Sequence, residues 1–238
     1  MVTGSASVLG GTSGTTSYAP SSSELVLYAF GRCGLRGPQI QAEHMRDART
    51  AANLILTDWA NDQPNLWTVA LQTISCVSGQ ITYTLPVNTI LVLDAYIEMS
   101  PGSAAPTDLY LYPLSRTEYS QLPNKVSPGR PSSYWFDRTL TPTVYMYQPP
   151  SSSTWTLNFY TVRQIQDMNF ANAQQPELPY PFLKAFADAL SAELAVIYAP
   201  ERAQALMAAA GASYIRAHEM NSERTPLYVI PGMNSYYR

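Results

Sequence analysis

The chain has 238 residues, a net charge of −3 and only 13% charged residues, about half of the usual ~25%. Its 14 lysines and arginines are scattered and outnumbered by 17 acidic residues, which argues against tight DNA binding through the phosphates. No apolar run approaches the ~18 residues of a membrane span, so we expect no contact with a membrane. The N-terminus lacks the basic and apolar segments of a signal peptide, which predicts assembly in the cytoplasm.

The low charge is accompanied by 17 tyrosines and 19 prolines. Tyrosine is enriched where proteins contact one another, and a surface with so few charges is poorly solvated. This composition favours a protein that works inside an assembly. A monomer with a tyrosine- and threonine-rich β surface is the alternative.

The N-terminal part of the chain predicts an arm and two helices. Residues 1–23 are rich in Gly, Ser and Thr and carry no charge, which is typical of a flexible arm. Ser22 or Ser23 is predicted to cap a short helix that Gly34 ends. A second helix is predicted over residues 40–61, because apolar residues spaced by three and four form one stripe: Met45, Ala48, Ala52, Ile55 and Trp59.

From residue 66 the apolar period changes to two, which predicts strands. Seven short runs are separated by turn signals such as Ser78-Gly79 and Pro101-Gly102. Ser115 and Glu118 have the spacing of a capping box and predict a helix of one or two turns. The seven runs are LWTVALQTISCV, QITYTL, ILVLDAYIEM, DLYLYPL, SSYWF, PTVYMYQ and TWTLNFYTVR.

After Pro176 the pattern returns to helix. Leu183, Phe186, Leu190, Leu194 and Ile197 form one stripe. Pro200 suits the first position of a further helix, whose predicted inner face carries Ala203, Met207, Ala210, Tyr214 and Ala217.

These patterns predict an α+β protein. The N- and C-terminal helix pairs (24–64 and 176–222) are expected to close into a four-helix bundle. An antiparallel β-sandwich or barrel (65–175) is inserted between the pairs.

The last segment, 223–238, is apolar, and its prolines prevent a helix. It is predicted either to dock in extended form on a partner or to pack back on its own β domain. The residues that would make the contact are Leu227, Tyr228, Val229, Ile230, Met233, Tyr236 and Tyr237.

Features of an enzyme are scarce. His44 and His218 lie far apart in the sequence, and neither HExxH, GxSxG nor a glycine-rich phosphate loop occurs. Cys33 and Cys76 have no metal-ligand spacing and are expected to be reduced residues of the core. We therefore expect no catalytic residue, no metal and no cofactor. A glycoside hydrolase with two facing carboxyl groups is a weaker alternative, because nothing in the sequence selects a pair.

Three stretches resemble phage head-to-tail adaptor proteins, the head-completion or tail-tubular proteins that lie beneath the portal. They are ELVLYAFGRCGL with AEHMRDARTAANLILTDWANDQPNLWTV, then SRTEYSQLPNKVSPGRPSSYWFDR, then PTVYMYQPP with TWTLNFYTVRQIQD. The resemblance covers roughly residues 24–222.

The resemblance implies a virion protein of the neck or tail that forms a ring, dodecameric like the portal. It would contact the portal protein and tail or nozzle proteins, and DNA would pass through its channel without sequence-specific binding. The C-terminal segment would dock on the portal. A β-sandwich module that binds a glycan or receptor is the alternative.

The aromatic run at residues 134–136 predicts a contact between subunits. Trp135 is expected to point into the β core, with Tyr134 and Phe136 towards a neighbouring subunit or loop, because strand side chains alternate. A role entirely within the domain is the alternative. Arg130 and Arg163 are candidates to bind carboxylates at that contact, since a planar guanidinium suits them.

Overall fold

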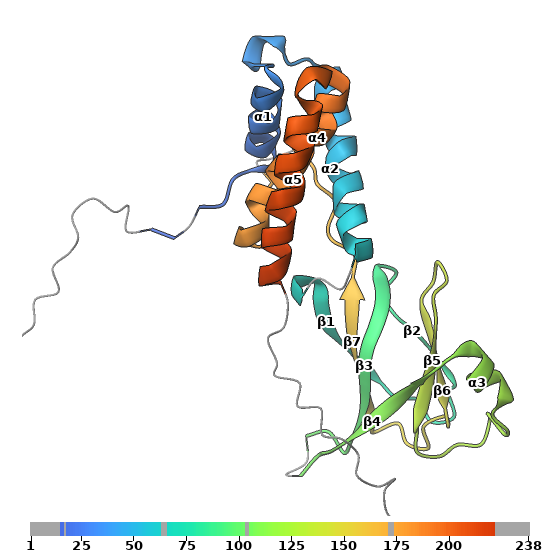
Figure 1. Ribbon diagram of the computed structural model, residues 1–238. Helices are drawn as coiled ribbons and strands as arrows, with labels where there is room; N and C mark the ends of the chain where they lie inside the picture. Colours follow the sequence, from blue (N-terminus) through green and yellow to red (C-terminus); the bar gives the residue numbers. More distant parts are fainter. Residues whose placement is uncertain (1–14, 17, 63–65, 103–104, 171–173, 222–238) are drawn as a thin grey trace, which may run out of the picture. The chain divides into compact units, whose positions relative to one another are not determined.

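The computed structural model describes residues 15–16, 18–62, 66–102, 105–170 and 174–221 (Figure 1). These residues form an α+β protein with five α-helices and one curled, mixed seven-stranded sheet. The chain divides into two compact units, Met1–Ala52 with Met168–Gly211, and Asn53–Asp167 with Ala212–Arg238. The domain boundaries predicted from the sequence stay a prediction.

Helix α1 (Ser22–Cys33) begins with a capping box. Ser21 Oγ accepts the Glu24 N–H (3.3 Å), and Glu24 Oε2 accepts the Ser21 N–H (2.7 Å). The predicted cap, Ser22 or Ser23, is therefore wrong, because only Ser21 has a glutamate three residues on. The predicted end is confirmed, since Gly34 has a φ of 92°, a conformation that glycine adopts without strain.

The remaining long helices are α2 (Ala42–Asp62), α4 (Tyr180–Tyr198) and α5 (Pro200–Met220). Helices α1 and α4 pack against each other. The predicted stripes of α1, α2 and α4 are largely confirmed, although Ile197 is 60% exposed. On α5 only Ala217 of the five predicted residues is buried and Met207 is 49% exposed, because the buried face is offset to Leu206 and Ser213. That all four helices close into one bundle stays a prediction. The predicted inner residues that are buried are Leu25, Ala29, Cys33, Ala48, Ala52, Ile55, Trp59, Phe186, Leu190, Leu194 and Ala217.

Each of the seven predicted β runs contains a strand, and the strand order is β1-β7-β3-β4-β5-β6-β2. The short helix α3 (Arg116–Gln121) follows β4 and begins with the predicted capping box of Ser115 and Glu118. Two 3-10 helices, Gly37–Gln39 and Leu66–Thr68, complete the elements described. The strands are β1 (Val69–Ser75), β2 (Thr82–Thr84), β3 (Thr89–Met99), β4 (Thr107–Leu114), β5 (Ser133–Asp137), β6 (Thr143–Tyr147) and β7 (Thr156–Arg163).

The sequence predicts an antiparallel β-sandwich or barrel, but the sheet is mixed and contains one parallel pair of strands. Strands β4 and β5 pair in parallel, with Tyr112 opposite Ser133 and Leu114 opposite Trp135. The physical reason is the long connection through α3, because parallel neighbours need a crossover rather than a tight turn.

The core of the sheet lies inside its curl. Its fully buried members include Ile97 and Leu111 from one half and Tyr134 and Met146 from the other. Cys76 also belongs to it, and burial raises the pKa of its thiol to about 11. Cys33 and Cys76 are both buried and free of disulfides, as predicted.

Candidate functional site

The structure describes only some of the predicted contact residues. The seven residues of the C-terminal segment lie outside the described residues. Of the candidates for a contact between subunits, Arg130 is exposed and Arg163 is half-buried. Phe136 is partly buried against the core of the sheet, and Tyr134 belongs to that core. Whether any of them contacts a neighbouring subunit stays a prediction.

The orientation predicted for the aromatic run is reversed. Tyr134 is 2% exposed and meets Phe159 edge to face, with ring centroids 6.2 Å apart. Burial, with smaller effects of Tyr110 and Asp94, raises the pKa of Tyr134 to about 12. Trp135 points the other way, because successive strand residues alternate. The sequence shows that the side chains alternate, but not whether Trp135 or the pair of Tyr134 and Phe136 faces the core.

Trp135 lies in an aromatic stack outside the core. Its ring lies 4.7 Å from that of Tyr145, and Tyr119 of α3 lies 5.6 Å from Trp135. Lys125 Nζ lies 5.4 Å above the Tyr119 ring and donates to the Ser120 and Leu122 carbonyl oxygens at 3.0 and 2.8 Å. Helix α3 therefore packs against β5 and β6 through Tyr119, and Lys125 binds the loop after α3 to the end of that helix.

A second aromatic surface lies on the other half of the sheet and was missed in the sequence. Tyr110 and Tyr112 of β4 are 49% and 64% exposed, with ring centroids 5.2 Å apart. Tyr96 of β3 pairs with Tyr110 and lies 6.3 Å from Tyr160 of β7. The alternation of tyrosine and leucine in DLYLYPL is visible in the sequence. The sequence does not reveal that β3, β4 and β7 are neighbours in the sheet.

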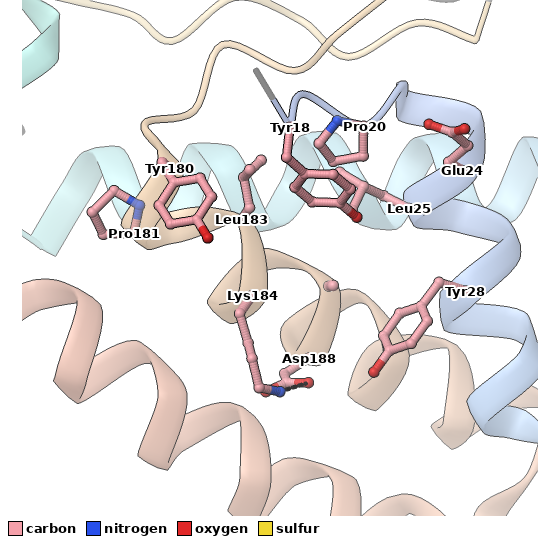
Figure 2. Close-up of a pocket in the computed structure, with 11 residues that line it drawn as sticks. Tyr18, Pro20, Glu24, Leu25, Tyr28, Tyr180, Pro181, Leu183, Lys184 and Asp188 are labelled. Atoms are coloured by element: carbon pink, nitrogen blue, oxygen red, sulfur yellow. Dashed lines mark hydrogen bonds and ion pairs between the residues drawn. The ribbon is translucent and has the colours of Figure 1, made fainter. Parts of the chain in front are cut away.

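The unit Met1–Ala52 with Met168–Gly211, here called the helical unit, carries a pocket of about 380 Å³ (Figure 2). Figure 2 shows Tyr18, Tyr28 and Tyr180 around it. Lys184 and Asp188 of α4 also line it, and the Asp188 carboxylate binds both Lys184 and Arg32 of α1. The Asp188 side chain is only 2% exposed, so this carboxylate links α1 and α4 below the pocket.

Replacing Asp188 with alanine is expected to lower the free energy of unfolding by about 3 kcal/mol, because it leaves the largely buried Arg32 guanidinium without its carboxylate. Urea unfolding followed by circular dichroism measures the change. Lys184→Ala is the matched control and should cost less than about 1 kcal/mol, since the Lys184 side chain is 68% exposed. Equal effects of the two substitutions would contradict the assigned role of Asp188.

Comparison with known protein families gives one decisive finding. The family model described as SU10 adaptor protein matches residues 36–229, which is most of the chain. The chain belongs to this family of phage adaptor proteins. The match confirms the resemblance to phage adaptors and extends to residue 229, within the C-terminal segment. A comparison with curated protein sequences gave no match.

Membership in the SU10 adaptor family indicates a structural component of a virion. Among the described residues, no helix is both long and apolar enough to cross a bilayer. In the same part of the chain, no three His, Cys, Asp or Glu side chains are grouped as metal ligands would be. The described residues present two aromatic faces on the sheet and a pocket in the helical unit as surfaces for contact with a partner.

Proposed function

We propose that the chain is a non-catalytic component of the phage neck, of the head-completion or tail-tubular type. It forms a ring beneath the portal, joins the head to the tail and lets DNA pass. In this proposal the four long helices close into a bundle, and the sheet forms a separate domain towards the tail or nozzle proteins. The copy number is that of the portal, twelve in the ring that the resemblance implies.

The observation that carries the proposal is the family match over residues 36–229, because it includes helices of both ends and the whole sheet. The composition supports it independently. Only 13% of the residues are charged, and Tyr110, Tyr112 and Tyr160 are exposed on the sheet, as is usual for surfaces that contact other proteins. The protein is assembled into virions in the host cytoplasm.

Electron microscopy of virions tests the proposal directly. Averaged images should place the protein as a ring between portal and tail, and an antibody fragment against it should label the neck. Label at the distal tail tip or on fibres would instead support the alternative, a β module that binds a glycan or receptor. In that case a purified, persistently monomeric chain should also fail to bind portal rings.

The proposed channel makes a prediction about DNA. The isolated protein should not retard duplex DNA at physiological salt, because a chain with a net charge of −3 releases few counterions from the phosphates. A gel-shift titration over a range of salt concentrations measures this. Nanomolar binding that weakens steeply with salt would contradict a passive channel and would require cations gathered by the assembled ring.

A further inference from the structure

The curled sheet presents two outward faces around one core, and these faces adjoin where β4 pairs with β5. Tyr134 of β5 and Phe159 of β7 meet inside the curl. Since adjacent strand residues point to opposite faces, Trp135 and Tyr160 point away from that core on its two sides. Figure 1 agrees, with α3 beside β5 and β6 and far from β1.

We name these two surfaces by their residues. The tyrosine face lies on β3, β4 and β7 and consists of Asp94, Tyr96, Glu98, Asp108, Tyr110, Tyr112 and Tyr160. The arginine face lies on α3, β5 and the adjoining loops. It consists of the Trp135 stack with Tyr119 and Tyr145 and of the exposed arginines in the segments that border it, Arg116 on α3, Arg130 before β5 and Arg138 directly after β5.

Charge is segregated between the segments that build these faces. Residues 66–115 contain three carboxylates and no basic residue, a net charge of −3. Residues 116–138 contain four basic and two acidic residues, a net charge of 4 − 2 = +2. Residues 139–162 contain no charged residue. The segments that build the two faces therefore carry net charges of opposite sign, with Glu118 and Asp137 the only carboxylates among residues 116–138.

The tyrosine face has the chemistry to bind guanidinium groups. Tyr110 Oη donates to Asp94 Oδ1 at 3.3 Å, so a phenol and a carboxylate lie side by side. Glu98 and Asp108 lie opposite each other on β3 and β4, two positions along from the pair of Tyr96 and Tyr110, and partial burial, Tyr160 and these two carboxylates raise the pKa of Tyr96. Arginine pairs with carboxylates and stacks on aromatic rings.

The arginine face offers the matching groups. Arg116, Arg130 and Arg138 are all exposed. The half-buried Trp135 lies among them in sequence and presents its ring outside the core. Tryptophan, tyrosine and arginine are the residues most often found at the centres of protein contacts.

We propose that the tyrosine face of one copy binds the arginine face of a second copy of this chain. The contact joins two different surfaces, so it is heterologous and continues from copy to copy until a ring closes. The proposal rests on the ring of the proposed function and identifies the surfaces that build it. Arg130, a predicted contact residue, takes part through the carboxylates of the neighbouring tyrosine face.

Charge reversal on the full chain tests this contact. An acid-reversed variant carries Asp94→Lys, Glu98→Lys and Asp108→Lys, and a base-reversed variant carries Arg116→Glu, Arg130→Glu and Arg138→Glu. Sedimentation at low salt should show that the wild type self-associates. Each variant alone should associate at least roughly a hundredfold more weakly, since like charges replace pairs worth about tenfold or more each.

An equimolar mixture of the two variants should recover association. In an assembly in which the two variants alternate, the introduced lysines of one variant meet the introduced glutamates of the other, and native carboxylates meet native arginines. Every contact therefore again joins opposite charges. The control, Arg36→Glu with Arg46→Glu on exposed positions of the helical unit, should associate like the wild type. A wild type that stays monomeric at every concentration, variants that associate normally, or a mixture that stays monomeric would each overturn the proposal.

A photo-crosslinking residue at Tyr112 gives a second test that does not depend on the folding of the triple variants. Because Tyr112 lies opposite Ser133 of its own chain, only crosslinks between two copies count, and these should map to residues 116–138 of the second copy. A crosslink to another segment, or none between copies, would overturn the proposed contact. Neither of these results tests whether the protein lies in the phage neck, which microscopy of virions decides. The proposed contact and the proposed function can therefore fail separately.

Discussion

Replacing Trp59 with alanine should lower the free energy of unfolding by about 3–5 kcal/mol, as truncation of buried tryptophans usually does. Trp59 of α2 is 6% exposed, and its ring lies 5.1 Å from that of Tyr214 on α5. Its removal leaves a cavity between two helices that are far apart in the sequence. The melting temperature should fall by roughly 6–20 °C, from the usual 2–4 °C per kcal/mol in chains of this size.

The matched control for Trp59 is Leu54→Ala on the same helix. The Leu54 side chain is 64% exposed, so its truncation should change the free energy of unfolding by about 0.5 kcal/mol or less. Thermal unfolding followed by circular dichroism and by tryptophan fluorescence compares the two. A shift of only a degree or two for Trp59→Ala would mean that the apolar stripe of α2 does not hold the helices together.

The helices and strands could be predicted because periodicity and end signals agreed. In α2 the spacing of Ala48, Ala52, Ile55 and Trp59 fixes one buried stripe, and Pro200 marks the start of α5. Ile197 and Met207 fit the period but are exposed. Apolar residues spaced by three and four positions predict one face of a helix. How much of that face a neighbouring element buries depends on tertiary packing.

The sheet was harder to predict because it depends on contacts between distant segments. Strand β7 lies between β1 and β3, a pairing that no local signal encodes. The parallel pair of β4 and β5 could have been expected, because a helix was predicted between them and a crossover suits parallel strands. The inward direction of Tyr134 depends on its partner Phe159, and the two are distant in the sequence.

The candidate surfaces were only partly visible in the sequence. The excess of tyrosine and the predicted role of Arg130 pointed towards contacts between proteins. The tyrosine face was not predicted, because Tyr96, Tyr110 and Tyr160 come from three strands whose order only the structure gives. Charge segregation can be read from the sequence, but only the structure shows that the two segments build separate parts of the outer surface of one curled sheet.

The C-terminal segment is where we expect the largest functional effect. It lies outside the described residues, and its role rests on its composition, on the adaptor resemblance and on a family match that extends to residue 229. Ordering such a segment costs roughly 1–2 kcal/mol per residue in backbone entropy. Burying its large apolar side chains contributes about 1.5–3 kcal/mol each, and main-chain pairing with a partner adds to this. Docking is thus favourable only where pockets receive several of these side chains together.

Deleting residues 225–238 should therefore abolish attachment to portal-bearing heads and leave the melting temperature of the isolated chain nearly unchanged. Co-sedimentation with purified heads measures attachment, and calorimetry measures stability. The control replaces the segment by a scrambled sequence of the same composition. It should also fail to attach, because the pockets require side chains in a set order. A truncated chain that is destabilised but still attaches would show that the segment belongs to its own core, and would move the portal contact to the helical unit.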